Sequence, residues 1–151
     1  MIPTGKGAIN HQPAFALCAT ADGVGGQAVH REQGTMNIKH INDIPADEVK
    51  AGTNTVKQVL ISSEEGPHFS MRRFIMQPGG GMPNHTNTVE HEQYVLRGTA
   101  QIGIADKVYD VKQGNVVYIP PDVPHWYKTT SDEPFEFLCL VPNLPDKVKL
   151  A

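Results

Sequence analysis

Four side chains that could hold a metal ion lie in two short stretches of the sequence. His85, Asn87 and His91 belong to one stretch, and His125 follows a proline-rich turn in the other. Residues i and i+2 of a β-strand face the same side, so His85 and Asn87 can point to a spot that His91 reaches from the next strand. Neutral imidazoles suit Zn, Mn, Fe, Ni or Cu. The spacing therefore predicts one divalent metal ion, held by His85, His91 and His125 inside a β-barrel.

Two neighbours of these histidines differ in what they could do. The amide oxygen of Asn87 could ligate the ion weakly, hydrogen-bond an ion-bound water, or face solvent. Glu92 directly follows His91, and adjacent strand residues face opposite sides, so a salt bridge or a wall contact is favoured over ligation. The sequence leaves the fourth ligand open.

The pocket around the ion is expected to include Gln93, Phe137 and Cys139. Phe137 and Cys139 alternate along one expected strand and so share its inner face. No activating partner for Cys139 is visible, which disfavours a catalytic thiolate, and the catalytic residues stay unassigned. Arg72 and Arg73 are adjacent, so only one of them can face the lumen. Four further polar candidates without an assigned position are Tyr94, Tyr109, Tyr118 and Tyr127.

Short apolar runs separated by Gly, Pro, Asn and Asp position these residues. The expected strands are 56–61, 69–76, 82–86, 91–97, 99–105, 108–111, 116–119, 125–128 and 134–141. Residues 37–49 are expected to form a short strand, a turn and one helical turn. Strands at a spacing of roughly 8–12 residues are typical of a sandwich or barrel. The pattern predicts an all-β fold.

The stretches 79–98 and 114–125 resemble the two signature motifs of the cupin superfamily, G-x5-H-x-H-x3,4-E-x6-G and G-x5-P-x-G-x2-H-x3-N. The resemblance covers roughly residues 68–145. This sequence departs from the pattern at four positions, which are Asn87 for a histidine, His91 for the glutamate, Asp122 for a turn glycine and Thr129 for the final asparagine.

The resemblance implies a small antiparallel cupin barrel, a jelly roll of the double-stranded β-helix type, with a metal ion in its lumen. The pair His91-Glu92 is similar to a subgroup of small single-domain cupins with a four-histidine manganese site, whose first motif runs H-x-H-x3-H-E. Manganese and iron are therefore the first candidates, with zinc, nickel and copper as alternatives.

Composition and charge limit the kinds of partner that this protein is expected to bind. The 151 residues carry a net charge of −3 without a basic stripe, which argues against nucleic acid. No apolar run approaches the ~18 residues of a membrane span. Two cysteines and a start unlike a signal peptide favour a cytoplasmic protein. Residues 1–36 are expected to be an extension, disordered or in contact with a dimer partner, and 37–151 to be the single barrel domain. Open barrel edges favour a homodimer.

Three functions agree with these features. The first is metal-dependent oxidation of an unidentified small molecule, as in the three-histidine dioxygenases that the ligand set resembles. The second is a non-catalytic module that binds or senses a small molecule. The third is metal-assisted isomerase or lyase chemistry on a carbonyl compound, with the ion as Lewis acid.

Overall fold

The computed structural model describes residues 37–150, so the expected extension 1–36 lies outside the described residues. The elements in chain order are the 3-10 helix η1 (Ile41–Asp43) and the strands β1 (Asp47–Glu48), β2 (Thr53–Ile61), β3 (Phe69–Asn87), β4 (His91–Arg97), β5 (Thr99–Ile104), β6 (Lys107–Lys112), β7 (Val116–Ile119), β8 (His125–Thr129), β9 (Phe135–Pro142) and β10 (Val148–Leu150). Among these residues, no helix has the length and hydrophobicity of a membrane span. The all-β prediction is confirmed.

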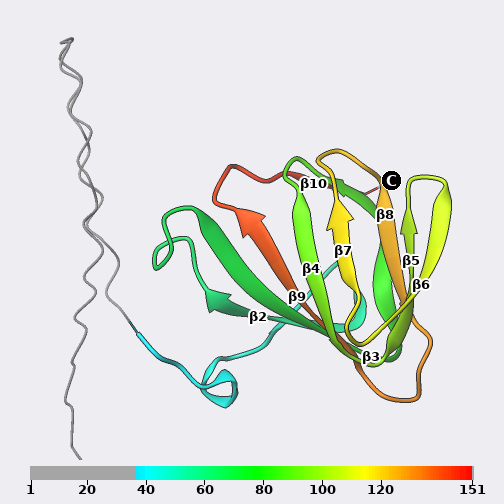
Figure 1. Ribbon diagram of the computed structural model, residues 1–151, viewed down its shortest axis with the longest axis horizontal. Coiled ribbons are helices and arrows are strands. Elements are labelled where there is room, and N and C mark those ends of the chain that lie inside the picture. Colours follow the sequence, from blue (N-terminus) through cyan, green and yellow to red (C-terminus); the bar gives the residue numbers. More distant parts are fainter. Residues whose placement is uncertain (1–36, 151) are drawn as a thin grey trace, which may run out of the picture. The chain divides into compact units, whose positions relative to one another are not determined.

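The strands form one curled antiparallel sheet. Its main path runs β6-β5-β8-β3-β9-β4-β7, with β2 and β10 also paired to β3, and β1 paired to β2. Figure 1 shows β9, β4 and β7 on one side and β8, β5 and β6 on the other, with β3 passing between them. The curled sheet has the form of a jelly roll, and its inner side chains line a cavity of about 250 Å³.

β3 is one strand of 19 residues, whereas the sequence predicted two strands, 69–76 and 82–86. Its first half pairs with β2 and β9, and its second half pairs with β8 and β10. Against β2 the register moves from Thr55↔Met76 to Thr53↔Gly81, so a bulge separates the halves. Such a bulge lets a strand bend sharply while its pairing continues. Sequence reasoning read this glycine-rich break as the end of a strand.

Alternation along the strands sorts side chains into an inner and an outer set. Along β4, His91, Gln93 and Val95 are buried and the residues between them are more exposed. Phe135 and Phe137 on β9 are 0% and 2% exposed, as expected for an inward face. Fully burying each such side chain contributes about 1.5–3 kcal/mol. This core stabilises the walls from which the polar inner residues project.

The turn before β8 explains one departure from the family pattern. Asp122 occupies the position of a turn glycine and adopts a positive φ of 60°. Aspartate tolerates this left-handed conformation better than most residues. Its backbone N–H donates to the carbonyl of Asn87 at 2.7 Å, which ties the turn to the end of β3. The turn thus places His125 beside β3.

Two glycines of the β3 bulge provide a test of this geometry. A Cβ at Gly81 would lie 2.2 Å from the carbonyl oxygen of Tyr127, whereas Gly79 has φ +74° and no atom within 4 Å of that position. We expect Gly81→Ala to lower the free energy of unfolding by about 1–3 kcal/mol, because the β3–β8 contact must open. Urea unfolding measures the change.

As a matched control, asparagine is introduced at Gly79 and at Gly81 in two separate variants. Asparagine adopts a left-handed φ readily, so Gly79→Asn should stay within about 1 kcal/mol of the parent protein. Gly81→Asn should be the more destabilising of the two by a wide margin. Equal losses at the two sites would contradict the close packing of Gly81 on β8.

Candidate metal centre

Three histidines converge from three strands on the space inside the sheet. His85 on β3 is the direct cross-strand neighbour of His125 on β8, and their ring centroids are 4.2 Å apart. His91 on β4 lies across from them, with its ring 5.4 Å from that of His125. All three side chains are buried. The structure therefore brings together the three histidines that the sequence singled out.

Two of these rings are held so that one nitrogen faces the space. The Nδ1 atoms of His85 and His125 lie 2.8 Å from the carbonyl oxygens of Pro83 and Val123. A carbonyl can only accept, so Nδ1 carries a proton in both rings, and in the neutral tautomer that fits this contact the lone pair is on Nε2. This is the arrangement found in metal-binding histidines, whose second nitrogen donates to a carbonyl or carboxylate.

Two of the histidine nitrogens at this point have no hydrogen-bond partner among residues 37–150. The Nε2 atoms of His91 and His125 are buried and form no hydrogen bond with any described residue. Buried polar atoms are normally satisfied, so an unmatched pair indicates a missing partner. Within residues 37–150, no group of three or more histidine, cysteine or carboxylate side chains has the spacing of a formed ion site. Ligation by His85, His91 and His125 therefore stays a prediction, which the chemistry of the donors fits.

Asn87 is buried and faces the same space, so the solvent-facing alternative does not hold in this structure. Its Nδ2 donates to a carboxylate oxygen of Asp146 at 2.7 Å, and the backbone N–H of Thr88 donates to the other oxygen at 3.1 Å. An amide nitrogen that faces a carboxylate turns its oxygen the opposite way. That oxygen, Oδ1, is buried without a partner among the described residues. Asp146 thus orients Asn87 as an oxygen donor.

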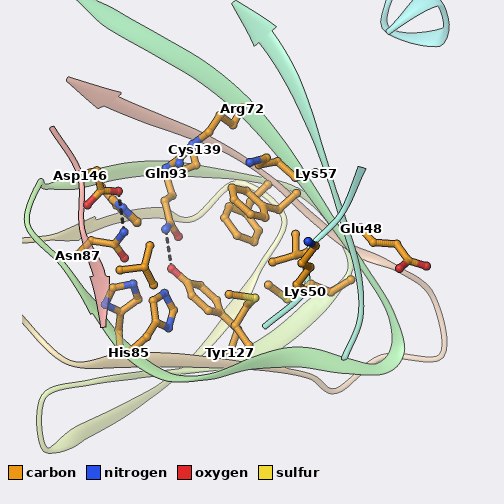
Figure 2. A pocket seen from close by; sticks show the side chains of 18 residues that line it. Glu48, Lys50, Lys57, Arg72, His85, Asn87, Gln93, Tyr127, Cys139 and Asp146 are labelled. Atoms are coloured by element: carbon orange, nitrogen blue, oxygen red, sulfur yellow. Dashed lines mark hydrogen bonds between the residues drawn. The ribbon is translucent and has the colours of Figure 1, made fainter. Parts of the chain in front are cut away.

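The expected pocket residues Gln93, Phe137 and Cys139 line one cavity of about 250 Å³ together with the three histidines and Asn87. Figure 2 shows this cavity, with Tyr127 reaching toward Gln93. The Tyr127 hydroxyl accepts a hydrogen bond from Gln93 Nε2 at 2.6 Å. Glu92 is exposed on the outer side of β4.

Sequence reasoning left several lining residues unplaced. Tyr127 could have been found, because it follows His125 by two positions and must share its face. The other three tyrosines, Tyr94, Tyr109 and Tyr118, are exposed. Asp146 carries no comparable signal, since it reaches the cavity from a loop between β9 and β10.

Comparison with known proteins identifies the fold. The family model described as a Cupin domain matches residues 72–141. A cupin 2 domain-containing protein from Halorhodospira halophila is 31% identical over 62% of this chain and 67% of its own, with a TM-score of 0.59. This chain belongs to the cupin superfamily.

Two further proteins that are similar to this chain differ in what is known of their function. The polyketide cyclase RemF from Streptomyces resistomycificus is 28% identical, covers 78% of this chain and 86% of its own, and has a TM-score of 0.71. An uncharacterized protein of Methanocaldococcus jannaschii is 33% identical over 52 residues, which are 34% of this chain and 42% of that protein. The match thus spans less than half of that curated relative.

Burial sets the protonation of this cupin site. Desolvation, aided by the charge of Arg72, lowers the pKa of His91 to about 3, and desolvation lowers the pKa of His125 to about 4. Burial raises the pKa values of Tyr127 and Cys139. At neutral pH both imidazoles are therefore unprotonated, as metal binding requires, and the phenol and thiol keep their protons.

The lowered pKa values predict a pH dependence of stability in metal-free protein. Because both histidines have lower pKa values in the folded than in the unfolded chain, their stabilisation is present above pH ~6.5 and is lost as the pH falls toward 4 and 3. Each should contribute a slope of roughly 1.4 kcal/mol per pH unit within that window. Urea unfolding in the presence of a chelator at stepped pH measures it.

A histidine variant separates this effect from other titrating groups. His91→Gln should remove about one proton from the difference between the folded and unfolded states, so its stability should fall less steeply below pH 6. His68→Gln, an exposed site outside the cavity, is the matched control. A slope in His91→Gln equal to that of the control would contradict a buried neutral His91.

The contact between Asp146 and Asn87 predicts a loss of metal affinity when the carboxylate is removed. In Asp146→Ala the amide is free to rotate, so its oxygen is no longer fixed toward the histidines. We expect the affinity for Zn²⁺ or Mn²⁺ to fall about tenfold or more, as is usual when a residue that orients a ligand is removed. Competition with a coloured chelator measures the affinity.

A double-mutant cycle supplies the control. Asn87→Ala should weaken binding by a similar factor, and adding Asp146→Ala to it should cause no further loss, because both act through one amide. Asp132→Ala, on an exposed bend, should leave affinity unchanged. Fully additive losses would show that Asp146 does not act through Asn87. Asn87→His should bind more tightly than the parent, since imidazole is the better donor toward these metals.

Proposed function

We propose that this cupin is a metal-dependent enzyme acting on a small molecule inside the barrel. The observation that carries the proposal is the set of buried, unpartnered donors, Nε2 of His91 and His125 and Oδ1 of Asn87, which face one cavity. Donor atoms buried in this way cost stability unless something binds them. A divalent cation matches their lone pairs and their lack of charge.

The residues around the cavity would have two different roles, metal binding and proton donation. His85, His91, His125 and Asn87 would hold the ion, which when bound supplies Lewis acidity and, if it is Mn or Fe, electron-transfer chemistry. The four donors are neutral, so the ion would keep its full charge. The phenol of Tyr127 accepts from Gln93 and keeps its own proton, which it can donate to an oxygen atom of a substrate.

Oxidation by O2 is the first candidate chemistry. Neutral ligands that leave coordination positions open suit a site at which a chelating substrate and O2 meet. The apolar side chains that line the cavity, among them Phe74 and Phe137, would limit the water around a reacting substrate. Fold alone does not select this reaction, so the assignment depends on the donor set.

Ring closure or isomerisation of a carbonyl compound is the second candidate. It is supported by the likeness to the polyketide cyclase RemF and by the neutral phenol of Tyr127, which could protonate an enolate oxygen. This reaction uses the ion as Lewis acid and consumes no O2. A module that binds its ligand without turnover is a third possibility, and it predicts neither O2 uptake nor product.

Metal analysis and oxygen uptake test the proposal. Protein purified without added metal and then loaded with Mn²⁺, Fe²⁺ or Zn²⁺ should retain about one ion per chain after dialysis, measured by mass spectrometry of the metal. A double variant, His91→Gln with His125→Gln, should retain none, and His68→Gln should behave as the parent. A parent that retains no ion would overturn the proposal.

Turnover then separates the candidate reactions. An oxygen electrode with a panel of phenols and β-dicarbonyl compounds should record metal-dependent uptake if the first candidate is right. Product formation under argon at an equal rate would establish the second. Metal retention with no product under either condition would favour the third possibility, a module that binds its ligand without turnover.

A further inference from the structure

The cavity contains a cation that the metal proposal does not use. Arg72 lies on the inner side of β3 and donates from Nη2 to the Cys139 sulfur at 3.3 Å. Its guanidinium carbon lies 5.5 Å from the centre of the Phe74 ring, within the range of a cation–π contact. Figure 2 shows Arg72 beside Cys139 and Gln93, across the cavity from His85.

The charge of Arg72 has no counter-ion among the described residues. Ion pairs in residues 37–150 are Lys39–Glu65, Arg73–Glu136 and Arg97–Glu133. Cys139 does not neutralise it, because burial raises the pKa of that thiol and keeps it protonated. The Nε atoms of Arg72 and Arg73 are both buried without a hydrogen-bond partner there, so the missing counter-ion, and not Nε, distinguishes Arg72. A guanidinium in this position costs stability until an anion joins it.

The neighbouring Arg73 differs from Arg72 in having a carboxylate partner. It faces the other side of β3, donates to Gln58, and is paired with Glu136. The two adjacent arginines are thus on opposite faces, as the sequence predicted, and only the one in the cavity is left without a carboxylate.

The other charged side chains that face the cavity also favour the binding of an anion near Arg72. Lys57 lies on β2 and Lys50 just before it, and both line the cavity. The carboxylates that line it are Glu48 and Asp146, and Asp146 is occupied by Asn87 and Thr88. Three cations against two carboxylates give the charged lining a net excess of one positive charge, which attracts anionic ligands.

The wall beside Arg72 is apolar. Phe74 and Phe137 stack with centroids 5.2 Å apart, and Tyr127 stacks on Phe137 at 5.4 Å. Met76 and Met82 also line the cavity. At about 250 Å³ the cavity is slightly smaller than most ligand pockets, which are typically ~300–1,000 Å³. Its occupant is therefore small, with an apolar body.

We infer that Arg72 is the carboxylate-binding residue of this cavity and that the substrate is a small organic acid with an apolar body. The guanidinium can form two parallel hydrogen bonds to a carboxylate, a geometry that lysine cannot reproduce. The body of the acid packs on Phe74 and Phe137, and its other end points toward the histidines. This inference rests on the proposed function for the identity of the reacting end, but the acid-binding step needs no ion.

Titration calorimetry of metal-free protein with benzoate tests the inference. Benzoate should bind the parent at millimolar concentrations, and benzamide, which has the same shape without the charge, should bind at least tenfold more weakly. Arg72→Gln should weaken benzoate binding tenfold or more, the usual effect of losing a charged hydrogen bond. Arg72→Lys should restore only part of the loss. Arg97→Gln, the same substitution outside the cavity, should match the parent.

Circular dichroism and thermal unfolding establish that each variant is folded, and Arg72→Lys retains the charge if the glutamine variant is unstable. Absence of benzoate binding to the parent, or equal affinity in parent, Arg72→Gln and Arg72→Lys, would overturn the inference. Benzoate binding that requires added Zn²⁺ and is unchanged by substitution of Arg72 would also overturn it, because the carboxylate would then bind the ion. Failure of the metal proposal is a separate result, since it appears as absent ion retention with an unchanged Arg72 dependence.

Discussion

The crossing of β3 from one half of the sheet to the other is the constraint on which the site depends. Its first half carries Arg72 and Phe74, and its second half carries His85 and Asn87. The bulge between them fixes how far apart and at what angle these two groups face each other. Close packing of Gly81 on the backbone of β8 leaves the bulge little freedom. One strand thus sets the length of the cavity, and the other strands complete its walls.

The predictable part of the site is the part governed by local alternation. The motif spacing sufficed to bring His85, His91 and His125 together, because each lies at a fixed distance from a turn in its own strand. Phe137 and Cys139 followed from the period of two along β9 in the same way. Strand positions were also predictable wherever Gly, Pro, Asn or Asp bounded an apolar run. The exception was β3, where glycines bend a strand without ending it.

The unpredictable part depends on contacts between residues far apart in the chain. Nothing near Asp146 in the sequence indicates that it meets Asn87, since the contact exists only once β10 has paired with β3. The choice between Arg72 and Arg73 as the inner residue likewise needed the register with β9, which sequence alone does not fix. Metal ligation itself stays a prediction, because donor type and orientation fit an ion but do not identify it.

The pairing of β10 with β3 has a consequence for dynamics. β10 is three residues long, all exposed, and it follows the loop that carries Asp146. Short strands whose side chains are all exposed open locally at lower free energy than the buried core, on the timescale that amide hydrogen exchange detects. Opening of β10 would separate Asp146 from Asn87 and let the amide turn, and it would also remove the strand that pairs with His85. The stability of this short strand therefore controls how firmly the Asn87 amide is held toward the cavity.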